Sequence, residues 1–194
     1  MVPDIYVAIR PVIDTFRHLG IPYHIGGSVA SSALGVARTT LDVDLVADIQ
    51  SNHVGAIVDS LLGEYYIDGD MISDAVIRRS SFNLVHLETM IKVDVFIPKE
   101  DAYGRESFAR KRLDRLAEGG EDEVYIASAE DVILHKLNWY KMGGEISERQ
   151  WNDLTGVLKV QRDALDTAYL RRWANELGLE ALLDRAVIEA GLVE

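Results

Sequence analysis

The sequence predicts an α+β fold, in which a small mixed β-sheet with flanking helices is followed by a C-terminal helical bundle. Up to about residue 126, short runs rich in β-branched residues alternate with helical patterns. From residue 128 onward the apolar residues recur at helical spacing. The 194 residues, 48% of them hydrophobic, are enough for one sizeable core or two small packed units. We therefore expect a core over residues 1–126 and a helical region over residues 127–194 packed on it, joined near residues 119–123.

The first half is expected to alternate helices with strands. Residues 3–19 form an amphipathic helix pattern that ends at Gly20, and residues 51–63 begin with a Ser-Asn cap signal and end at a glycine. A tight turn around Glu88 and Thr89 predicts a hairpin. The expected strands cover residues 21–25, 42–47, 81–88, 91–97 and 123–127.

The second half predicts helices only. Ser128 with Asp131, and Ser147 with Gln150, resemble capping boxes at the start of two of them. The expected helices cover residues 128–144, 147–161, 165–178 and 179–191. Their spacing predicts a bundle.

Composition excludes several classes of protein. The formal net charge of −12 disfavours binding of bulk nucleic acid, because such a surface repels polyanions. Cysteine is absent, which excludes disulfides and thiolate metal sites. No apolar run is long enough to cross a bilayer, and the N-terminus lacks a signal-peptide pattern, so we expect a soluble cytoplasmic protein. The basic residues of segment 105–116 allow two interpretations. They fit either a solvent-exposed charged face or a binding surface for a phosphate-bearing substrate.

Two carboxylates stand on one face of the strand predicted over residues 42–47. Alternate residues of a strand share a face, so Asp42 and Asp44 point one way. On the strand over residues 91–97, Asp94 shares its face with Lys92. If the two strands are neighbours, three carboxylates can converge, and a hard divalent cation would neutralise them. Mg²⁺ fits because it takes one or two carboxylates and then substrate phosphates; Mn²⁺ is the second candidate.

A glycine turn precedes the helix-like segment 28–35. Gly26, Gly27 and Ser28 connect the strand over residues 21–25 to that segment. Such a turn presents backbone N–H groups and the positive end of a helix dipole, which bind phosphate. Gly27 allows close approach, and Ser28 can donate its hydroxyl. These residues predict a triphosphate site.

In this order, the motifs resemble those of the nucleotidyltransferase superfamily, which includes DNA polymerase beta and the aminoglycoside nucleotidyltransferases. The matching motifs are Ile25-Gly26-Gly27-Ser28, then Asp42-Val43-Asp44, then Val93-Asp94-Val95 on a later strand. Gly35 and Arg38-Thr39-Thr40 look like those of AbiEii-type toxins and related stand-alone bacterial enzymes. The resemblance implies a nucleotidyltransferase core over residues 1–126.

The resemblance also implies roles for residues after the sheet. Lys136 would reach the triphosphate, and Asp153 would orient the acceptor or support Lys136. Lys136 also fits a side chain that only extends from an apolar helix face to solvent. Arg38 fits two roles equally, as a phosphate ligand or as the group that neutralises Asp42.

The activity implied is metal-dependent transfer of a nucleoside monophosphate from a nucleoside triphosphate, ATP among them, to a hydroxyl acceptor, with release of pyrophosphate. Asp42, Asp44 and Asp94 would hold the metal, and Asp94 would either complete a two-metal site or take the acceptor proton. The acceptor is a small molecule, a protein side chain or a tRNA end. Two alternatives stand beside this function: a non-catalytic module that senses nucleotide or binds a partner, and a toxin that acts with an antitoxin.

Overall fold

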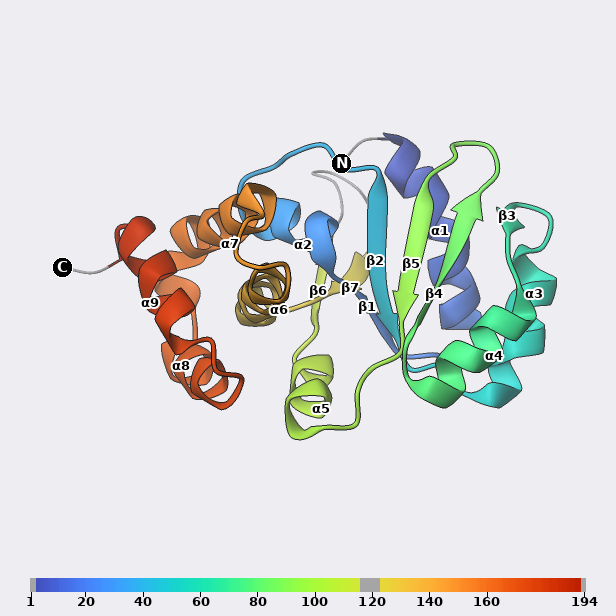
Figure 1. The fold of residues 1–194 in the computed structure, drawn as a ribbon. Coiled ribbons are helices and arrows are strands. Elements are labelled where there is room, and N and C mark those ends of the chain that lie inside the picture. The colour runs from blue at the N-terminus through green and yellow to red at the C-terminus, as the bar shows by residue number, and fades with distance from the viewer. Residues whose placement is uncertain (1–2, 116–122, 193–194) are drawn as a thin grey trace. The chain divides into compact units, whose positions relative to one another are not determined.

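The computed structural model describes residues 3–115 and 123–192 (Figure 1). The chain forms two compact units, Met1–Gly26 with Thr39–Ile126, and Gly27–Arg38 with Ala127–Glu194. Residues 27–38, predicted as part of the core region, group with the helical unit.

The first unit contains a mixed sheet with the strand order β3-β4-β5-β2-β1-β7-β6. Its strands are β1 (Tyr23–Ile25), β2 (Asp42–Ala47), β3 (Tyr65–Tyr66), β4 (Ser81–His86), β5 (Lys92–Phe96), β6 (Arg112–Arg115) and β7 (Glu123–Ile126). β2 runs parallel to β5 and antiparallel to β1, and β5 runs antiparallel to β4. β2 and β5 therefore lie side by side in the interior of the sheet.

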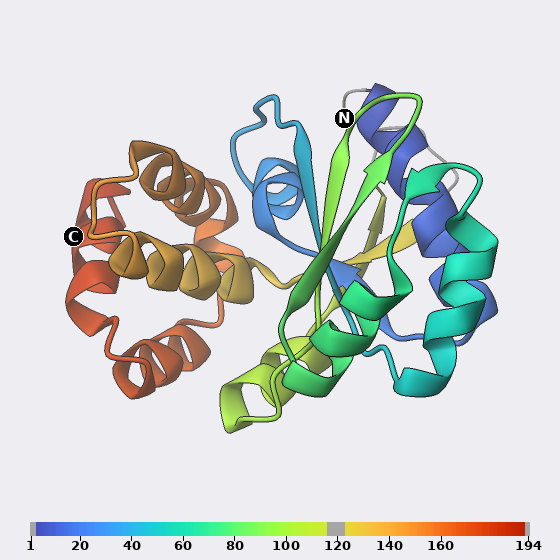
Figure 2. The same ribbon diagram turned by 45° about the vertical axis from the view of Figure 1, so that its right-hand side comes forward.

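Helices cover one face of this sheet. The helices of the unit are α1 (Pro3–His18), α3 (Val54–Leu61), α4 (Gly69–Arg78) and α5 (Ala102–Ala109). Figures 1 and 2 show α1, α3 and α4 together on the same face. Val43, Leu45, Val93 and Val95 alternate along β2 and β5 and are completely buried. Because alternate residues share a face, the residues between them, including the three aspartates, lie on the other side of the sheet.

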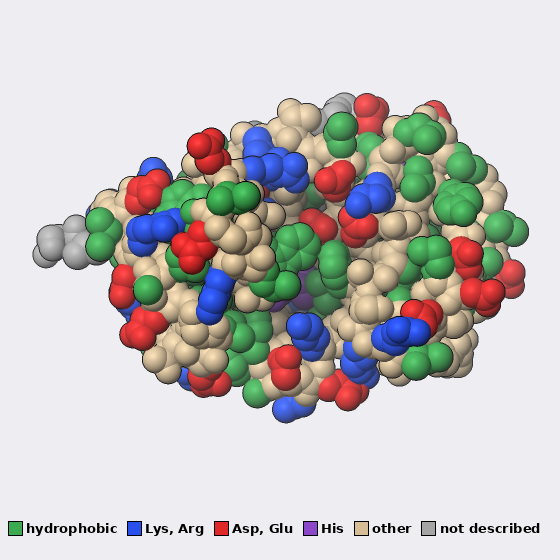
Figure 3. Space-filling view, viewed as in Figure 1, with side chains coloured by type: hydrophobic (Ala, Val, Ile, Leu, Met, Phe, Trp, Pro, Cys, Tyr) green, Lys and Arg blue, Asp and Glu red, His purple; other side chains and the backbone are tan. Residues whose placement is uncertain are grey.

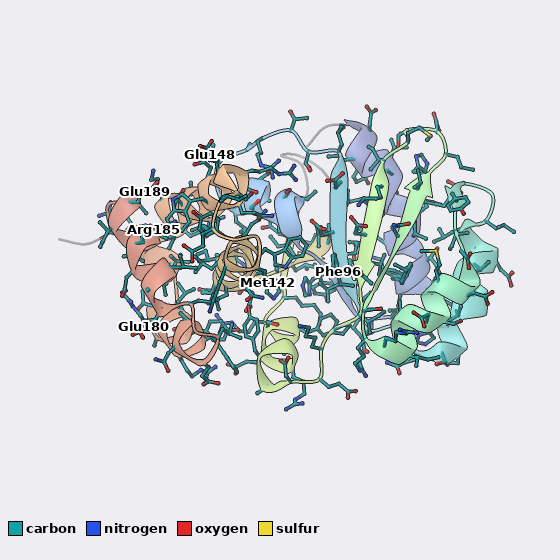
Figure 4. All side chains as sticks on the ribbon, in the orientation of Figure 1. Phe96, Met142, Glu148, Glu180, Arg185 and Glu189 are labelled. Carbon is teal, nitrogen blue, oxygen red and sulfur yellow. The ribbon has the colours of Figure 1, made fainter. Side chains whose placement is uncertain are left out.

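The second unit consists of helices. They are α2 (Gly27–Leu34), α6 (Ala129–Met142), α7 (Glu148–Gln161), α8 (Thr167–Glu176) and α9 (Glu180–Glu189). α7 packs against α2, α6 and α9, and α8 packs against α6 and α9. Two α9 residues labelled in Figure 4 attach it to Trp151 of α7: Glu189 accepts a hydrogen bond from Trp151 Nε1 at 2.8 Å, and the Arg185 guanidinium lies 3.8 Å from the centroid of a Trp151 ring.

Two glycines allow the end of α2 to approach α7 closely. A Cβ on Gly35 would lie 2.7 Å from the backbone nitrogen of Val157, closer than real Cβ atoms come. A Cβ on Gly156 would lie 3.3 Å from a methyl group of Val36. Gln161 of α7 also donates a hydrogen bond to the Leu34 carbonyl at 2.7 Å. This close packing fixes the backbone that leads to Arg38.

Most predicted elements are present, and the capping predictions are confirmed. Ser128 Oγ accepts a hydrogen bond from the Asp131 amide at 3.1 Å, and Ser147 Oγ accepts one from the Gln150 amide at 3.4 Å. The hairpin between β4 and β5 is closed by a 2.8 Å bond from the Met90 amide to the His86 carbonyl. The sequence analysis did not predict β3, α4, α5 or β6.

The sequence predicted a joint near residues 119–123 and no segment that crosses a membrane. Residues 119–122 of the expected joint lie outside the described residues, and its last residue, Glu123, begins β7. Among the helices of residues 3–115 and 123–192, none is long and apolar enough to cross a bilayer.

Candidate functional site

The carboxylates of β2 and β5 lie on one face of the sheet. In the parallel register, Asp44 is opposite Asp94, and Asp42 is opposite Lys92. Convergence of these carboxylates depends on β2 and β5 being neighbours, and they are. We call these four side chains, Asp42, Asp44, Lys92 and Asp94, the carboxylate face. Figure 3 shows acidic side chains beside a basic one over this part of the sheet.

Lys92 is the residue of this face that the site assignment missed. Its ammonium lies 2.7 Å from Asp94 Oδ2, and its side chain is 45% exposed. The hydrogen bond with Asp94 raises the pKa of the Lys92 amine; burial opposes this rise, and the charges of Asp94, Asp42 and Asp44 add to it. The signal was present in the sequence, because residues two apart on a strand share a face.

The expected three-carboxylate metal cluster is not assembled in the structure. Across residues 3–115 and 123–192, no three side chains of His, Asp or Glu form a group that could hold a metal ion. The ammonium of Lys92 instead pairs with Asp94 on this face.

The chemistry of the donors still fits Mg²⁺. Mg²⁺ is commonly bound by one or two carboxylates together with water and substrate phosphates, so it needs no complete protein cage. Asp44 and Asp94, opposite each other on adjacent strands, can supply two carboxylates, with Asp42 on the same face. Assignment of the metal to these residues stays a prediction.

The glycine turn differs from its predicted role at one residue. The Gly26 amide donates a 2.8 Å hydrogen bond to the Asp44 carbonyl, which extends the pairing of β1 with β2. It is therefore not one of the unpaired phosphate donors expected from the sequence. Gly27 has φ +52°, a left-handed conformation that favours glycine, and α2 begins there. The turn thus requires a glycine at position 27.

In the second unit, Asp153 of α7 binds two cations. Arg38 forms a bidentate ion pair with it, with Nε 2.6 Å from Oδ1 and the second nitrogen 2.8 Å from Oδ2. Lys136 of α6 lies 2.6 Å from Oδ2. The side chains of Asp153 and Lys136 are only 4% and 6% exposed. Lys136 is therefore buried in an ion pair, which contradicts the alternative in which it extends to solvent.

Ser28 joins the same group. Its Oγ accepts a hydrogen bond from Arg38 at 2.6 Å and another from Arg149 at 3.4 Å. A hydroxyl that accepts hydrogen bonds keeps its own proton to donate. Arg38 thus has a partner, Asp153, that neither sequence interpretation named. We call Ser28, Arg38, Lys136, Arg149 and Asp153 the cationic cluster.

Electrostatics favour one of the two roles predicted for Asp153. Burial alone would raise its pKa, but hydrogen bonds from Arg38 and Lys136, together with their charges, lower it below the ordinary value of 3.8. A carboxylate held in its charged form is a weak proton acceptor. This supports the prediction that Asp153 holds Lys136 in place.

The basic strip of segment 105–116 has local partners. Arg105 donates to the Glu100 carbonyl, and Arg115 lies 3.9 Å from Glu123. The Lys111 ammonium lies 4.4 Å from the centroid of the Phe108 ring. These contacts favour the interpretation as a solvated face.

Comparison with solved structures shows which fold the chain adopts. An antigenic nucleotidyltransferase-like protein from Paracoccidioides brasiliensis aligns over 96% of this chain and 93% of its own, with a TM-score of 0.59 and 16% identity. The antibiotic-resistance factor ANT(2'')-Ia aligns over 90% and 96%, with a TM-score of 0.52 and 18% identity. A Thermotoga maritima protein provisionally named a nucleotidyltransferase aligns over 78% and 94%, with a TM-score of 0.51 and 15% identity.

No protein-family model matches the chain, and no curated protein sequence matches it significantly. At the identities given above, the structural matches show the fold alone. It is the nucleotidyltransferase fold that the sequence predicted. The finer likeness to AbiEii-type enzymes stays a prediction.

Proposed function

We propose, from a nucleotidyltransferase fold whose adjacent strands pair Asp44 with Asp94, that the protein is a metal-dependent nucleotidyltransferase. The observation that carries this proposal is the β2–β5 register, because it places two carboxylates opposite each other on one face. Carboxylates gathered on one face attract cations, and a metal–nucleoside triphosphate brings one.

The reaction joins the acceptor hydroxyl to the α-phosphorus and breaks the bond from that phosphorus to the β-phosphate, which releases pyrophosphate. Asp44 and Asp94, with Asp42, would hold Mg²⁺ or Mn²⁺. The bound metal would supply charge neutralisation at the α-phosphate and at the departing pyrophosphate. Asp94 would either complete a two-metal site or take the proton of the acceptor hydroxyl.

The cationic cluster is proposed to bind the triphosphate. It contains three cationic side chains, Arg38, Lys136 and Arg149, around the hydroxyl of Ser28 and the carboxylate of Asp153, and cationic side chains are the groups that bind phosphate. Ser28 has a hydroxyl proton to donate, and the N-terminus of α2 begins beside it at Gly27. Asp153 holds Arg38 and Lys136 rather than exchanging a proton with substrate.

The acceptor is proposed to be a small hydroxyl-bearing molecule or a protein side chain. The net charge of −12 repels a long polyanion, which leaves a tRNA end as the less favoured acceptor. An antitoxin partner remains an expectation of the sequence resemblance. Growth arrest on expression that Asp44→Asn abolishes would support the toxin role.

The experiment is calorimetric titration of each nucleoside triphosphate into the wild type, Asp44→Asn and Asp59→Asn, with Mg²⁺ and then with a chelator. Asp59 is an exposed carboxylate of α3 and controls for the loss of one negative charge. We expect Mg²⁺-dependent binding by the wild type and by Asp59→Asn, and its loss in Asp44→Asn. Binding that is equal in all three proteins would contradict the assignment of the carboxylate face.

A further inference from the structure

Lys92 forms an ion pair with one of the carboxylates that are proposed to bind the metal. Its ammonium is 2.7 Å from Asp94 Oδ2, the carboxylate that lies opposite Asp44. The same ammonium interacts electrostatically with Asp42 and Asp44. Lys92 is therefore the counter-ion of Asp94, and its position opposite Asp42 brings its charge close to the other two carboxylates.

An ammonium and a divalent cation compete for the same carboxylate. Mg²⁺ binds oxygen at about 2.1 Å, so a cation on Asp94 would stand within a few ångströms of the ammonium at its present position. Two positive charges at that separation repel. Movement of the Lys92 side chain away from Asp94 would relieve this repulsion.

Lys92 is able to leave. Its side chain is 45% exposed and that of Asp94 is 21% exposed, so water can replace the contact. Exposed ion pairs contribute little to stability, and a lysine carries its charge on a flexible four-carbon stem. Its backbone stays paired with β2 opposite Asp42 while the ammonium moves.

We propose that Lys92 is a built-in counter-ion that holds Asp94 in the metal-free protein and lowers the affinity of the carboxylate face for a divalent cation. This rests on the proposed function, because it takes the three aspartates as the metal ligands. Metal binding would then depend on the nucleotide. Free metal competes poorly with Lys92 for Asp94, whereas a metal–nucleoside triphosphate also brings an anion that the displaced ammonium can contact.

The test measures Mn²⁺ binding by electron paramagnetic resonance, first in the absence of nucleotide and acceptor and then with a nucleoside triphosphate, whose own affinity is measured by calorimetry. The proteins are the wild type, Lys92→Met, Lys92→Arg, Lys159→Met and Asp44→Asn. Lys159 is an exposed residue of α7 and controls for the loss of one positive charge. Circular dichroism checks that each variant folds.

Lys92→Met is expected to bind Mn²⁺ about tenfold more tightly than the wild type, since an adjacent positive charge has been removed. Lys159→Met is expected to match the wild type. Lys92→Arg keeps the charge and is expected to bind no more tightly than the wild type. It provides a result even if Lys92→Met fails to fold, because tighter binding by Lys92→Arg would contradict the proposal.

The outcomes separate this inference from the proposed function. If Lys92→Met and the wild type bind Mn²⁺ equally, and Asp44→Asn abolishes binding, the metal site stands and the inference is wrong. If Lys92→Met loses affinity for the nucleotide while Mn²⁺ binding is unchanged, Lys92 is a phosphate ligand and the inference is wrong. If neither protein binds Mn²⁺, even with a nucleoside triphosphate, both the inference and the metal assignment are overturned.

Discussion

The carboxylate face and the cationic cluster are both groups of ion-paired side chains, but carboxylates are the majority in the first and cations in the second. The first has three carboxylates and one ammonium on adjacent strands. The second has three cations and one carboxylate on helices and the segment after α2. By formal charge, the named groups of the first region are net negative and those of the second are net positive.

The two regions differ in burial. Asp153 and Lys136 have side chains that are almost fully buried, whereas Lys92 and Asp94 remain partly exposed. A buried ion pair cannot lose one partner cheaply, because the remaining charge has no water to solvate it. An exposed pair can open at little cost. The cationic cluster therefore belongs to the folded framework, and the carboxylate face is free to exchange its counter-ion.

Asp153→Asn should have the largest effect on stability. The substitution removes the carboxylate charge that pairs with Arg38 and Lys136, and breaking such a buried pair costs about 3–5 kcal/mol. The free energy of unfolding is measured by urea denaturation, with the exposed Asp163→Asn as control. A loss no larger than that of the control would show that the burial of Asp153 does not make its ion pairs structural.

Gly35→Ala should destabilise the protein by about 1–3 kcal/mol, as overpacking against backbone does. The added Cβ would meet the backbone of Val157 and push the α2 end away from α7, which also carries Asp153. The control is Gly63→Ala, where a Cβ meets no atom within 4 Å. Equal unfolding free energies for the two variants would contradict the close-packing argument.

The stability that Asp153 contributes should depend on pH in one direction. Its folded pKa lies below the ordinary value of 3.8, because hydrogen bonds and charges from Arg38 and Lys136 outweigh the effect of burial. The contribution is therefore complete above that ordinary value and is lost as the pH falls through the folded pKa. The difference in unfolding free energy between the wild type and Asp153→Asn should be constant from neutral pH to about pH 5 and narrow only in stronger acid. If this difference in unfolding free energy already narrows above pH 5, the pKa of Asp153 in the folded protein is raised rather than lowered, which would contradict the prediction.

Asp94→Asn should have the smallest effect on stability, within about 1 kcal/mol, because its ion pair is partly exposed and its loss also relieves repulsion from Asp44. The same urea denaturation measures it. A cost similar to that of Asp153→Asn would remove the contrast between the two regions. The carboxylate face would then be a structural ion cluster.

Local patterns in the sequence were sufficient for several features of the site. The period of two along a strand predicted that Asp42 and Asp44 share a face, and the same rule pointed to Lys92 beside Asp94. Ser128 and Ser147 were predicted as caps because a cap involves residues only three positions apart. By contrast, α5 and β6 have few buried side chains, so they lack the apolar periodicity by which helices and strands are recognised.

The sequence by itself determined the chemistry that this protein carries: paired acids on strands, a glycine turn and basic residues after it. Only the tertiary structure decided which charges meet. The register of β2 with β5 places Asp44 opposite Asp94, and packing of α2 against α7 brings Arg38 to Asp153, 115 positions away. Such contacts depend on sheet pairing and on the fit of glycine surfaces, which no local window of sequence contains. The partner of Arg38 was missed for that reason.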